Sequence, residues 1–374
     1  MQIPFVDLKA QYARLKPQIN ARIQRVLEHG QFISGPEVAE LEAALAEYAG
    51  ARHAVGLSSG TDALLVPLLA AGIGAGHAVF LPSFTFTATA EMVLLAGATP
   101  VFVDVDPRTF NIDPSDLDQR IKEVQKAGRL LPRAVIAVDL FGLPADYDKI
   151  GAIAQQYDLL VIADAAQSFG ADAVGKKVGT LAEVTATSFF PAKPLGGYGD
   201  GGAVLTNSDA LAALYRSIRS HGTGEDKYDI VRLGLNARLD TLQAAILLAK
   251  LEVFPEEMVA RKKLADYYDS RLTQYLATPV RIACADSAWA QYTIQCDNRD
   301  GLRAALGAQG IPTAIYYPRP MHLQPAYEAY GPGEGGLPAS EDLAGRVLSL
   351  PMHPYMPEET AERICHAVIE AVTG

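Results

Sequence analysis

The chain carries the stretch Ser188-Phe189-Phe190-Pro191-Ala192-Lys193-Pro194-Leu195-Gly196-Gly197-Tyr198-Gly199-Asp200-Gly201-Gly202. Lys193 stands there among small, apolar and aromatic residues, and no other lysine occurs between Lys177 and Lys227. Apolar surroundings disfavour the charged form of an amine, so they favour a neutral, nucleophilic lysine. Such a lysine can form a Schiff base with pyridoxal phosphate. That cofactor also needs a carboxylate for its ring nitrogen, amides for its phosphate and a flat group against its ring.

A carboxylate occurs where this cofactor would need one. Asp164 directly follows the apolar run at 159–163, and the carboxyl ends of buried parallel strands form the ligand-binding edge of open α/β sheets. Asp is also a favoured helix N-cap. Because a strand-like segment at 184–189 separates Asp164 from Lys193, the cofactor role is favoured, and we predict that Asp164 pairs with the pyridine nitrogen.

Two further segments offer the remaining partners. Residues 58–63 follow a strand-like run and open a helix, where free amides and the helix dipole suit a phosphate, although a plain N-cap would use the same residues. Phe84 and Phe86 follow another predicted strand at the same sheet edge. Either ring could stack on the pyridine, while a place in the core is the more common fate of phenylalanine.

Residues 197–202 also satisfy the pattern G-x-G-x-x-G, which is typical of dinucleotide-binding sites. In such sites the pattern follows a strand and opens a helix. Here it leads into the β-like run at 203–206, so a dinucleotide site is rejected. The glycines are better explained as residues that let the backbone turn tightly around Lys193.

The wider pattern predicts an α/β fold. Between about residues 41 and 207, short apolar runs alternate with helical patterns, as in a mostly parallel sheet with helices on both faces. Helices are expected near 239–254 and 258–275, separated by Pro255, and then strand, helix and strand at 290–296, 302–309 and 313–317. We therefore predict a large cofactor-binding domain at 1–250 and a small α+β domain at 251–374. A mobile loop is expected at 331–338 because it is rich in Gly and Pro.

Composition limits the function further. The chain has 374 residues, 49% of them apolar, and a net charge of −11, which argues against nucleic acid or an anionic membrane as a partner. The three cysteines are widely separated and lack metal-site spacing, so no metal is expected and a reducing cytoplasmic compartment fits. Asp7 and Lys9 exclude a signal peptide at residues 1–9, and no apolar run is long enough to span a bilayer.

With these residues together, the chain resembles the DegT/StrS family of sugar aminotransferases, which are fold-type I pyridoxal-phosphate enzymes. The similarity runs from residues 5–8 to residues 348–354, and its most specific blocks are 59–64, 164–170, 188–202 and 234–240. It implies a homodimer with shared active sites. It also implies the roles of individual residues: Lys193 as the Schiff-base lysine, Asp164 as the pyridinium partner, Gly60, Thr61 and Ser188 as phosphate ligands, Phe86 as the stacking ring, Gln167 beside the phenolic oxygen, and Asn236 reaching the phosphate from the neighbouring subunit.

Within the family, 188–196 and 349–355 are most similar to the subgroup that aminates UDP-2-acetamido-2-deoxy-3-oxo-glucuronate. The resemblance implies amination at C3 of a UDP-linked 3-keto sugar with L-glutamate as donor, for bacterial surface or secondary-metabolite amino sugars. Gln167 fits this subgroup, because many C4-aminating relatives have histidine there. Tyr316 departs from it, because relatives commonly have histidine at that position, so amination at C4 of a 4-keto-6-deoxy sugar stays open.

Substrate contacts are expected from residues able to bind diphosphate, carboxylate or hydroxyl groups. They are Arg238, Tyr317, Arg319 and His322, although a solvated arginine or a structural histidine explains Arg319 and His322 equally well. His221 and His353 are further candidates. Two other functions compete: a sugar dehydratase, in which the lysine is replaced by histidine, and a cofactor-binding regulator. Lys193 is intact and no DNA-binding module is visible, so an aminotransferase is favoured over both.

Overall fold

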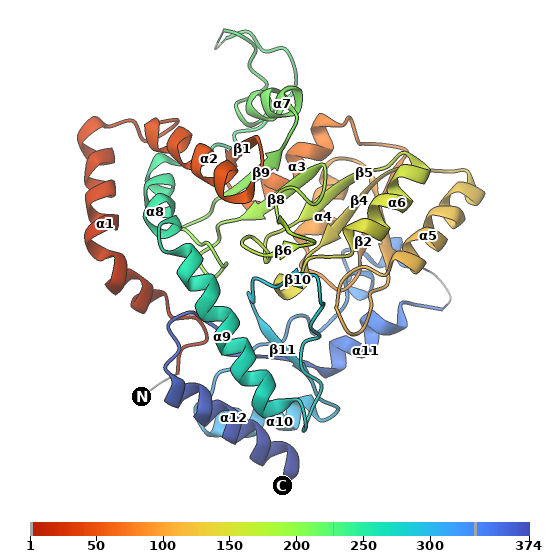
Figure 1. Cartoon of the computed structure of the whole chain (residues 1–374). Helices are drawn as coiled ribbons and strands as arrows, with labels where there is room; N and C mark the ends of the chain where they lie inside the picture. The colour runs from red at the N-terminus through yellow and green to blue at the C-terminus, as the bar shows by residue number, and fades with distance from the viewer. Residues whose placement is uncertain (1–2, 227, 333–334) are drawn as a thin grey trace.

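A seven-stranded mixed sheet forms the centre of the computed structural model, which describes residues 3–226, 228–332 and 335–374 (Figure 1). Every neighbouring pair is parallel except the two that involve β9, which runs antiparallel to β1 and β8. The predicted mostly parallel sheet is therefore confirmed. The strand order is β1 (His53–Leu57), β9 (Gly202–Thr206), β8 (Val184–Ser188), β5 (Leu160–Asp164), β4 (Leu131–Val138), β2 (His77–Pro82) and β3 (Thr99–Val103).

Helices cover both faces of this sheet, which is why its strands are apolar throughout. In β2, Val79 and Leu81 join the core under α3 (Gly60–Ala70), α4 (Ala88–Leu95) and α7 (Asp209–Arg219). Ala78 and Phe80 point the other way, toward α5 (Pro114–Ala127) and α6 (Tyr147–Tyr157), because successive strand residues face opposite sides. On that second face α2 (Pro36–Ala49) and α8 (Thr241–Leu251) pack over β1 and β9.

Helix boundaries agree with the sequence in most places and differ in two. The expected separator Pro255 lies in the first turn of α9 (Phe254–Leu272), where proline is tolerated because its missing N–H has no helical partner. The helix α1 (Leu8–His29) was not predicted from sequence. Its buried residues are sparse, and it packs through Leu15 and Ile19 on Ile246 of α8.

A second core lies at the lower end of Figure 1, away from the sheet. It gathers α9, α10 (Arg299–Ala308) and α12 (Glu358–Thr373) around the antiparallel strands β11 (Tyr292–Gln295) and β12 (Val347–Leu350). Ile3, from the other end of the chain, is buried in the same core. The strand expected at 313–317 is wrong: that segment makes an isolated bridge between Ala314 and Ser349.

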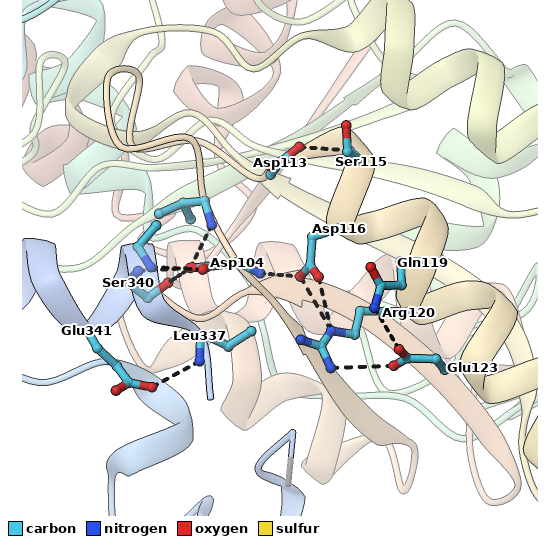
Figure 2. A network of polar contacts seen from close by, with 12 residues as sticks. Asp104, Asp113, Ser115, Asp116, Gln119, Arg120, Glu123, Leu337, Ser340 and Glu341 are labelled. Atoms are coloured by element: carbon cyan, nitrogen blue, oxygen red, sulfur yellow. Dashed lines mark hydrogen bonds and ion pairs between the residues drawn. The ribbon is translucent and has the colours of Figure 1, made fainter. Parts of the chain in front are cut away.

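Residues 321–332 and 335–346, which form two 3₁₀ turns and a helix, pack mainly on the unit built around the large sheet. Met321, which begins the 3₁₀ turn η2 (Met321–Leu323), and Tyr327, which precedes the 3₁₀ turn η3 (Glu328–Tyr330), lie in the core of α3 and α4. Helix α11 (Pro338–Arg346) is held at its N-terminus by Asp104, which follows β3 (Figure 2). The Asp104 carboxylate accepts hydrogen bonds from Ala339 N (2.9 Å) and from Ser340 N (2.8 Å) and Oγ (2.6 Å). The domain boundary at 250/251 stays a prediction.

Short elements complete the chain. They are η1 (Leu140–Gly142) and the strands β6 (Asp172–Ala173), β7 (Lys176–Lys177) and β10 (Ala285–Asp286), which pair in a three-stranded sheet. The expected mobile loop at 331–338 includes residues 333 and 334, which lie outside the described residues, and its last residue, Pro338, already begins α11. In the described ranges, no helix has the length and apolar character needed to cross a membrane.

Candidate active site

One edge of the sheet brings most of the predicted site residues together. Five strands end there because they run in the same direction, namely β1, β8, β5, β4 and β2. Strand β9 begins there. Gly202 at the start of β9 pairs with Leu57 of β1 and with Ser188 of β8. Asp164 ends β5 two strands away from β9. The carboxyl ends of strands thus meet where the sequence placed the cofactor.

Lys193 lies on the loop between β8 and β9, in a turn closed by a bond from its own N–H to Phe190 O (2.9 Å). The surrounding protein desolvates the amine, and this lowers the pKa of Lys193, while the charge of Asp164 acts in the opposite direction. A lowered pKa increases the fraction of neutral amine, which is the nucleophilic form. The local environment therefore has the character that the sequence predicted.

Asp164 is buried, with 7% of its surface exposed. Desolvation raises the pKa of this carboxyl, while the N–H of Ala166, the charge of Lys193 and the hydroxyl of Thr89 favour the ionised form. Thr89 Oγ1 donates to Asp164 Oδ2 at 3.0 Å, and Ala166 N donates to Oδ1 at 3.2 Å. A buried carboxylate held in this way is suited to a cationic partner such as a pyridinium nitrogen.

The three predicted phosphate ligands occupy one corner. Helix α3 begins at Gly60, and a Cβ added at Gly60 would lie 2.5 Å from Ser188 Cβ, so this glycine is required by the close approach of β8. The side chain of Ser59 caps the helix by accepting from Asp62 N at 3.0 Å. Gly60, Thr61 and Ser188 therefore lie together, with helix N–H groups and hydroxyls that suit an anion.

Phe86 stands at the same edge with its ring 55% exposed, which is unusual for phenylalanine and leaves a face available for a flat ligand. The Phe84 ring is fully buried, so the two candidates for the stacking ring are distinguished by their exposure. Tyr317 lies beside both, with ring centroids 6.4 Å from Phe86 and 6.2 Å from Phe84.

Gln167 is buried and bridges this corner to the C-terminal segment. Its Oε1 accepts from Phe141 N (2.6 Å), and its Nε2 donates to Tyr317 Oη (3.3 Å). Burial raises the pKa of Tyr317 above the ordinary tyrosine value, so the phenol keeps its proton at neutral pH. Tyr317 is thus brought to the site, and its contact with a substrate stays a prediction.

The other predicted substrate residues have different surroundings. Arg319 is exposed two residues after Tyr317. His322 is buried: its Nδ1 contacts Ser83 Oγ (2.7 Å), and its Nε2 contacts Glu341 Oε1 (3.1 Å). Because both ring nitrogens are engaged within the chain, the contacts support the structural role for His322 that the sequence left open.

Asn236 and Arg238 lie on a chain segment beside β1, where Arg238 bridges to Leu57. Arg238 donates to Asn236 Oδ1 through Nε (3.1 Å) and Nη2 (2.7 Å). An open pocket of about 440 Å³ borders both residues and is also lined by Ser58 and Asp200. Asn236 is exposed.

The two remaining histidine candidates, His221 and His353, differ in their surroundings. His221 is exposed and adopts a positive φ of 62°. His353 is buried beside Arg261, and desolvation lowers the pKa of His353 to about 4, so its ring is neutral. Among the described residues, neither ring nitrogen of His353 has a hydrogen-bond partner. The described ranges also contain no cluster of His, Cys, Asp and Glu able to hold a metal.

Sequence reasoning missed a buried carboxylate next to Asp164. Asp139 follows β4 as Asp164 ends β5, and its side chain accepts from Ser168 Oγ (2.6 Å), Ala145 N (2.8 Å) and Tyr147 Oη (2.8 Å). Burial raises the pKa of Asp139 to about 7. The same signal that identified Asp164, a carboxylate at the end of an apolar run, was present in the sequence for Asp139.

Comparison with known proteins agrees with this arrangement. Residues 13–369 match the sequence profile of the DegT/DnrJ/EryC1/StrS aminotransferase family. The chain belongs to this family. It is therefore a pyridoxal-phosphate-dependent aminotransferase of fold-type I, as the residues at the sheet edge indicated.

Three known proteins illustrate what the chain is similar to. The UDP-2-acetamido-2-deoxy-3-oxo-D-glucuronate aminotransferase of Pseudomonas aeruginosa is 50% identical over 98% of this chain and 99% of its own. A crystal structure of a family aminotransferase from Brucella abortus has a TM-score of 0.98 and 51% identity, covering 100% of both chains. NtdA from Bacillus subtilis, solved with the bound cofactor PMP, has a TM-score of 0.88 and 29% identity, covering 100% of this chain and 86% of that one.

The residues present fit this cofactor. Asp164 supplies a desolvated carboxylate, Lys193 an amine with a lowered pKa, and the start of α3 a cradle that a side chain at Gly60 would fill. Phe86 leaves a ring face exposed. Each of the four demands made by pyridoxal phosphate thus has a residue at the same sheet edge.

Proposed function

We propose that this aminotransferase transfers an amino group from L-glutamate to C3 of a UDP-linked 3-keto sugar. The observation that carries the proposal is the convergence of Lys193, Asp164, Gly60 and Ser188 at one sheet edge, in a chain 50% identical to an enzyme named for a UDP-linked 3-oxo sugar. The product would be an amino sugar for a bacterial surface polysaccharide, such as a lipopolysaccharide O-antigen, or for a secondary metabolite.

In this proposal each residue has a defined task. Bound pyridoxal phosphate supplies the carbonyl carbon that receives the amino group and a ring that withdraws electrons from the reacting carbon. Lys193 would hold the cofactor through Nζ. Its amine would also accept the proton from the substrate carbon, because its lowered pKa leaves part of it neutral. Asp164 keeps the ring nitrogen protonated, oriented by Thr89 and Ala166.

Two groups of residues position the cofactor on the sheet edge. Gly60, Thr61 and Ser188 bind its phosphate with the amides and hydroxyls at the start of α3. Phe86 covers one face of the ring, and Gln167 lies beside the phenolic oxygen. Gln167 is already fixed through Phe141, so little side-chain entropy would be lost when the cofactor binds.

The sugar nucleotide is recognised by Arg238, Tyr317 and Arg319. An arginine binds a diphosphate or a carboxylate through a planar pair of donors. Arg238 is fixed by its two hydrogen bonds to Asn236 and lines the adjoining pocket. Tyr317 provides a protonated phenol next to the Phe86 ring.

The active sites are shared in a homodimer. Asn236 is exposed, and the segment after α7 extends beyond the rest of the chain in Figure 1, with Ile230 at 56% exposure and Leu233 at 96%. Apolar side chains on a projecting segment favour burial against a second copy. We place Asn236 at the cofactor phosphate of the partner subunit. A cytoplasmic location fits the three unpaired cysteines.

The proposal is tested with a panel of UDP-, dTDP- and GDP-linked 3-keto and 4-keto sugars in the presence of L-glutamate. We expect amination of a UDP-linked 3-keto sugar, formation of 2-oxoglutarate, and loss of both activity and the visible cofactor absorbance in Lys193→Ala. Amination of 4-keto sugars alone would replace the proposed position by C4. Turnover by Lys193→Ala at the wild-type rate would contradict the role of the lysine.

A further inference from the structure

A second lysine near the catalytic loop has no part in the site described above. Lys250, in the last turn of α8, has a side chain with 0% exposure. Lysine is almost never fully buried unless its charge is compensated, because removing an ammonium from water is costly. Desolvation lowers the pKa of Lys250 to about 8, and the charge of Glu257 opposes this shift. Burying the Lys250 amine therefore lowers the stability of the fold, and we ask what the amine does in return.

The contacts of Lys250 are with the loop that carries Lys193. Its Nζ donates to Gly196 O at 2.5 Å and lies 4.1 Å from the centre of the Tyr198 ring. Gln243, two turns earlier on the same face of α8, accepts from Tyr198 N through Oε1 at 2.8 Å. One helix thus holds two residues of the catalytic loop, Gly196 and Tyr198, through a charge-assisted hydrogen bond, a cation–π contact and a hydrogen bond to a side-chain amide.

This loop needs such support because of its composition. Four glycines lie within residues 196–201, and glycine loses more conformational freedom on ordering than any other residue. A Cβ at Gly196 would collide with Pro191 O, and one at Gly197 would lie 2.8 Å from Gln243 Oε1. The glycines are therefore required by close packing, while the order of the loop has to come from contacts outside it.

We propose that Lys250 is a positioning residue for the catalytic loop: its ammonium, bound to Gly196 O and the Tyr198 ring, holds residues 190–198 in the conformation that presents Lys193 at the sheet edge. This inference rests on the proposed role of Lys193. Lys250 acts through the loop and touches neither substrate nor cofactor. A buried methylene chain that ends in a donor suits this task, because Gly196 is itself buried.

The test is hydrogen exchange of residues 189–202 in cofactor-free protein, combined with kinetics of the loaded enzyme. In Lys250→Met, which keeps the length and removes the charge and the donor, we expect exchange at Gly197 and Tyr198 to be about tenfold faster. The rate of the half-reaction with L-glutamate should fall about tenfold while its KM stays within about twofold of wild type. Lys262→Met, at an exposed lysine of α9, is the matched control and should change neither.

Tyr198→Leu is the second variant, because Tyr198 is 37% exposed and its loss is compatible with folding. It removes the aromatic face that receives the ammonium, so exchange in the same segment should also accelerate if Lys250→Met fails to fold. Unchanged exchange in folded Lys250→Met, or in Tyr198→Leu where Lys250→Met does not fold, would overturn the inference. A kcat of folded Lys250→Met equal to that of wild type would also overturn the inference. Failure of the proposed function is distinct, since wild-type protein would then lack glutamate-dependent turnover while the exchange measurement still reports on the loop.

Discussion

At the residue scale, burial sets the charge state of the groups at the sheet edge. Asp164 and Lys193 are both desolvated, with the pKa of the carboxyl raised and that of the amine lowered. The charge of each group partly offsets the pKa shift that desolvation causes in the other, so the charge states of the two groups are linked. In a cofactor with a cationic ring nitrogen and a carbonyl carbon, the ring nitrogen would pair with the Asp164 carboxylate and the carbonyl carbon would react with the Lys193 amine.

Asp139 makes the stability of the protein depend on pH. Its pKa is raised to about 7 by burial, so the folded chain binds this proton more tightly than the unfolded chain does. The contribution of Asp139 is therefore fully present at pH values below about 4 and is lost as the pH rises toward 7, by at most about 1.4 kcal/mol per pH unit. Asn at this position keeps the oxygen that accepts from Ala145 and Tyr147 and does not titrate.

We expect Asp139→Asn to gain stability relative to wild type as the pH rises from 5 to 8. Urea unfolding at both values, with equal cofactor content, measures the difference. Asp297→Asn, at a carboxylate 91% exposed, should follow the wild-type pH profile. Identical pH profiles for wild type and Asp139→Asn would show that Asp139 is ionised throughout this range.

At the element scale, a carboxylate from the sheet unit caps a helix that lies late in the sequence. Asp104 accepts two backbone bonds and a hydroxyl bond from the start of α11, and Ser340 is fully buried (Figure 2). Asp104→Ala should cost about 1–3 kcal/mol of unfolding free energy, because it leaves buried N–H groups without partners. Chemical denaturation measures this loss.

The matched control is Asp297→Asn, which removes an exposed ion pair with Arg346 near the other end of α11. Such pairs contribute about 0–1 kcal/mol. If Asp104→Ala lost no more stability than this control, α11 would not depend on its cap.

Local sequence pattern predicted the strands and the sheet-edge residues because each is encoded within a few neighbours. An apolar run followed by Asp is sufficient to locate Asp164, and Ser59 followed by Gly60 locates the start of α3. The structural role of His322 could not be predicted, since its partners Ser83 and Glu341 are brought to it by the fold. The same holds for Lys250, whose contact with Gly196 spans 54 positions.

At the scale of the whole molecule, the proposed dimer predicts complementation between inactive variants. If Asn236 acts at the partner's phosphate, Lys193→Ala in one subunit and Asn236→Ala in the other both fall in the same site of a mixed dimer. One site then carries both substitutions and the other carries neither. We expect co-expressed variants to regain up to about a quarter of wild-type activity when subunits pair at random.

Differently tagged subunits, purified through both tags, allow the mixed dimers to be assayed alone. Each variant by itself is the control. Activity no greater than the sum of the two variants would place Asn236 and Lys193 in the same subunit's site, or would indicate a monomer if light scattering gives a mass near 39.9 kDa.

The burial of Ile3 within the core of α9, α10 and α12 has a consequence for synthesis on the ribosome. Ile3 is translated long before Leu348, Ile364 and Val368, which complete that core. Its side chain therefore remains undocked while the intervening chain is synthesised. A chaperone that shields nascent chains would act on this segment throughout that interval, and Ile3 would dock only after Val368 has left the ribosome.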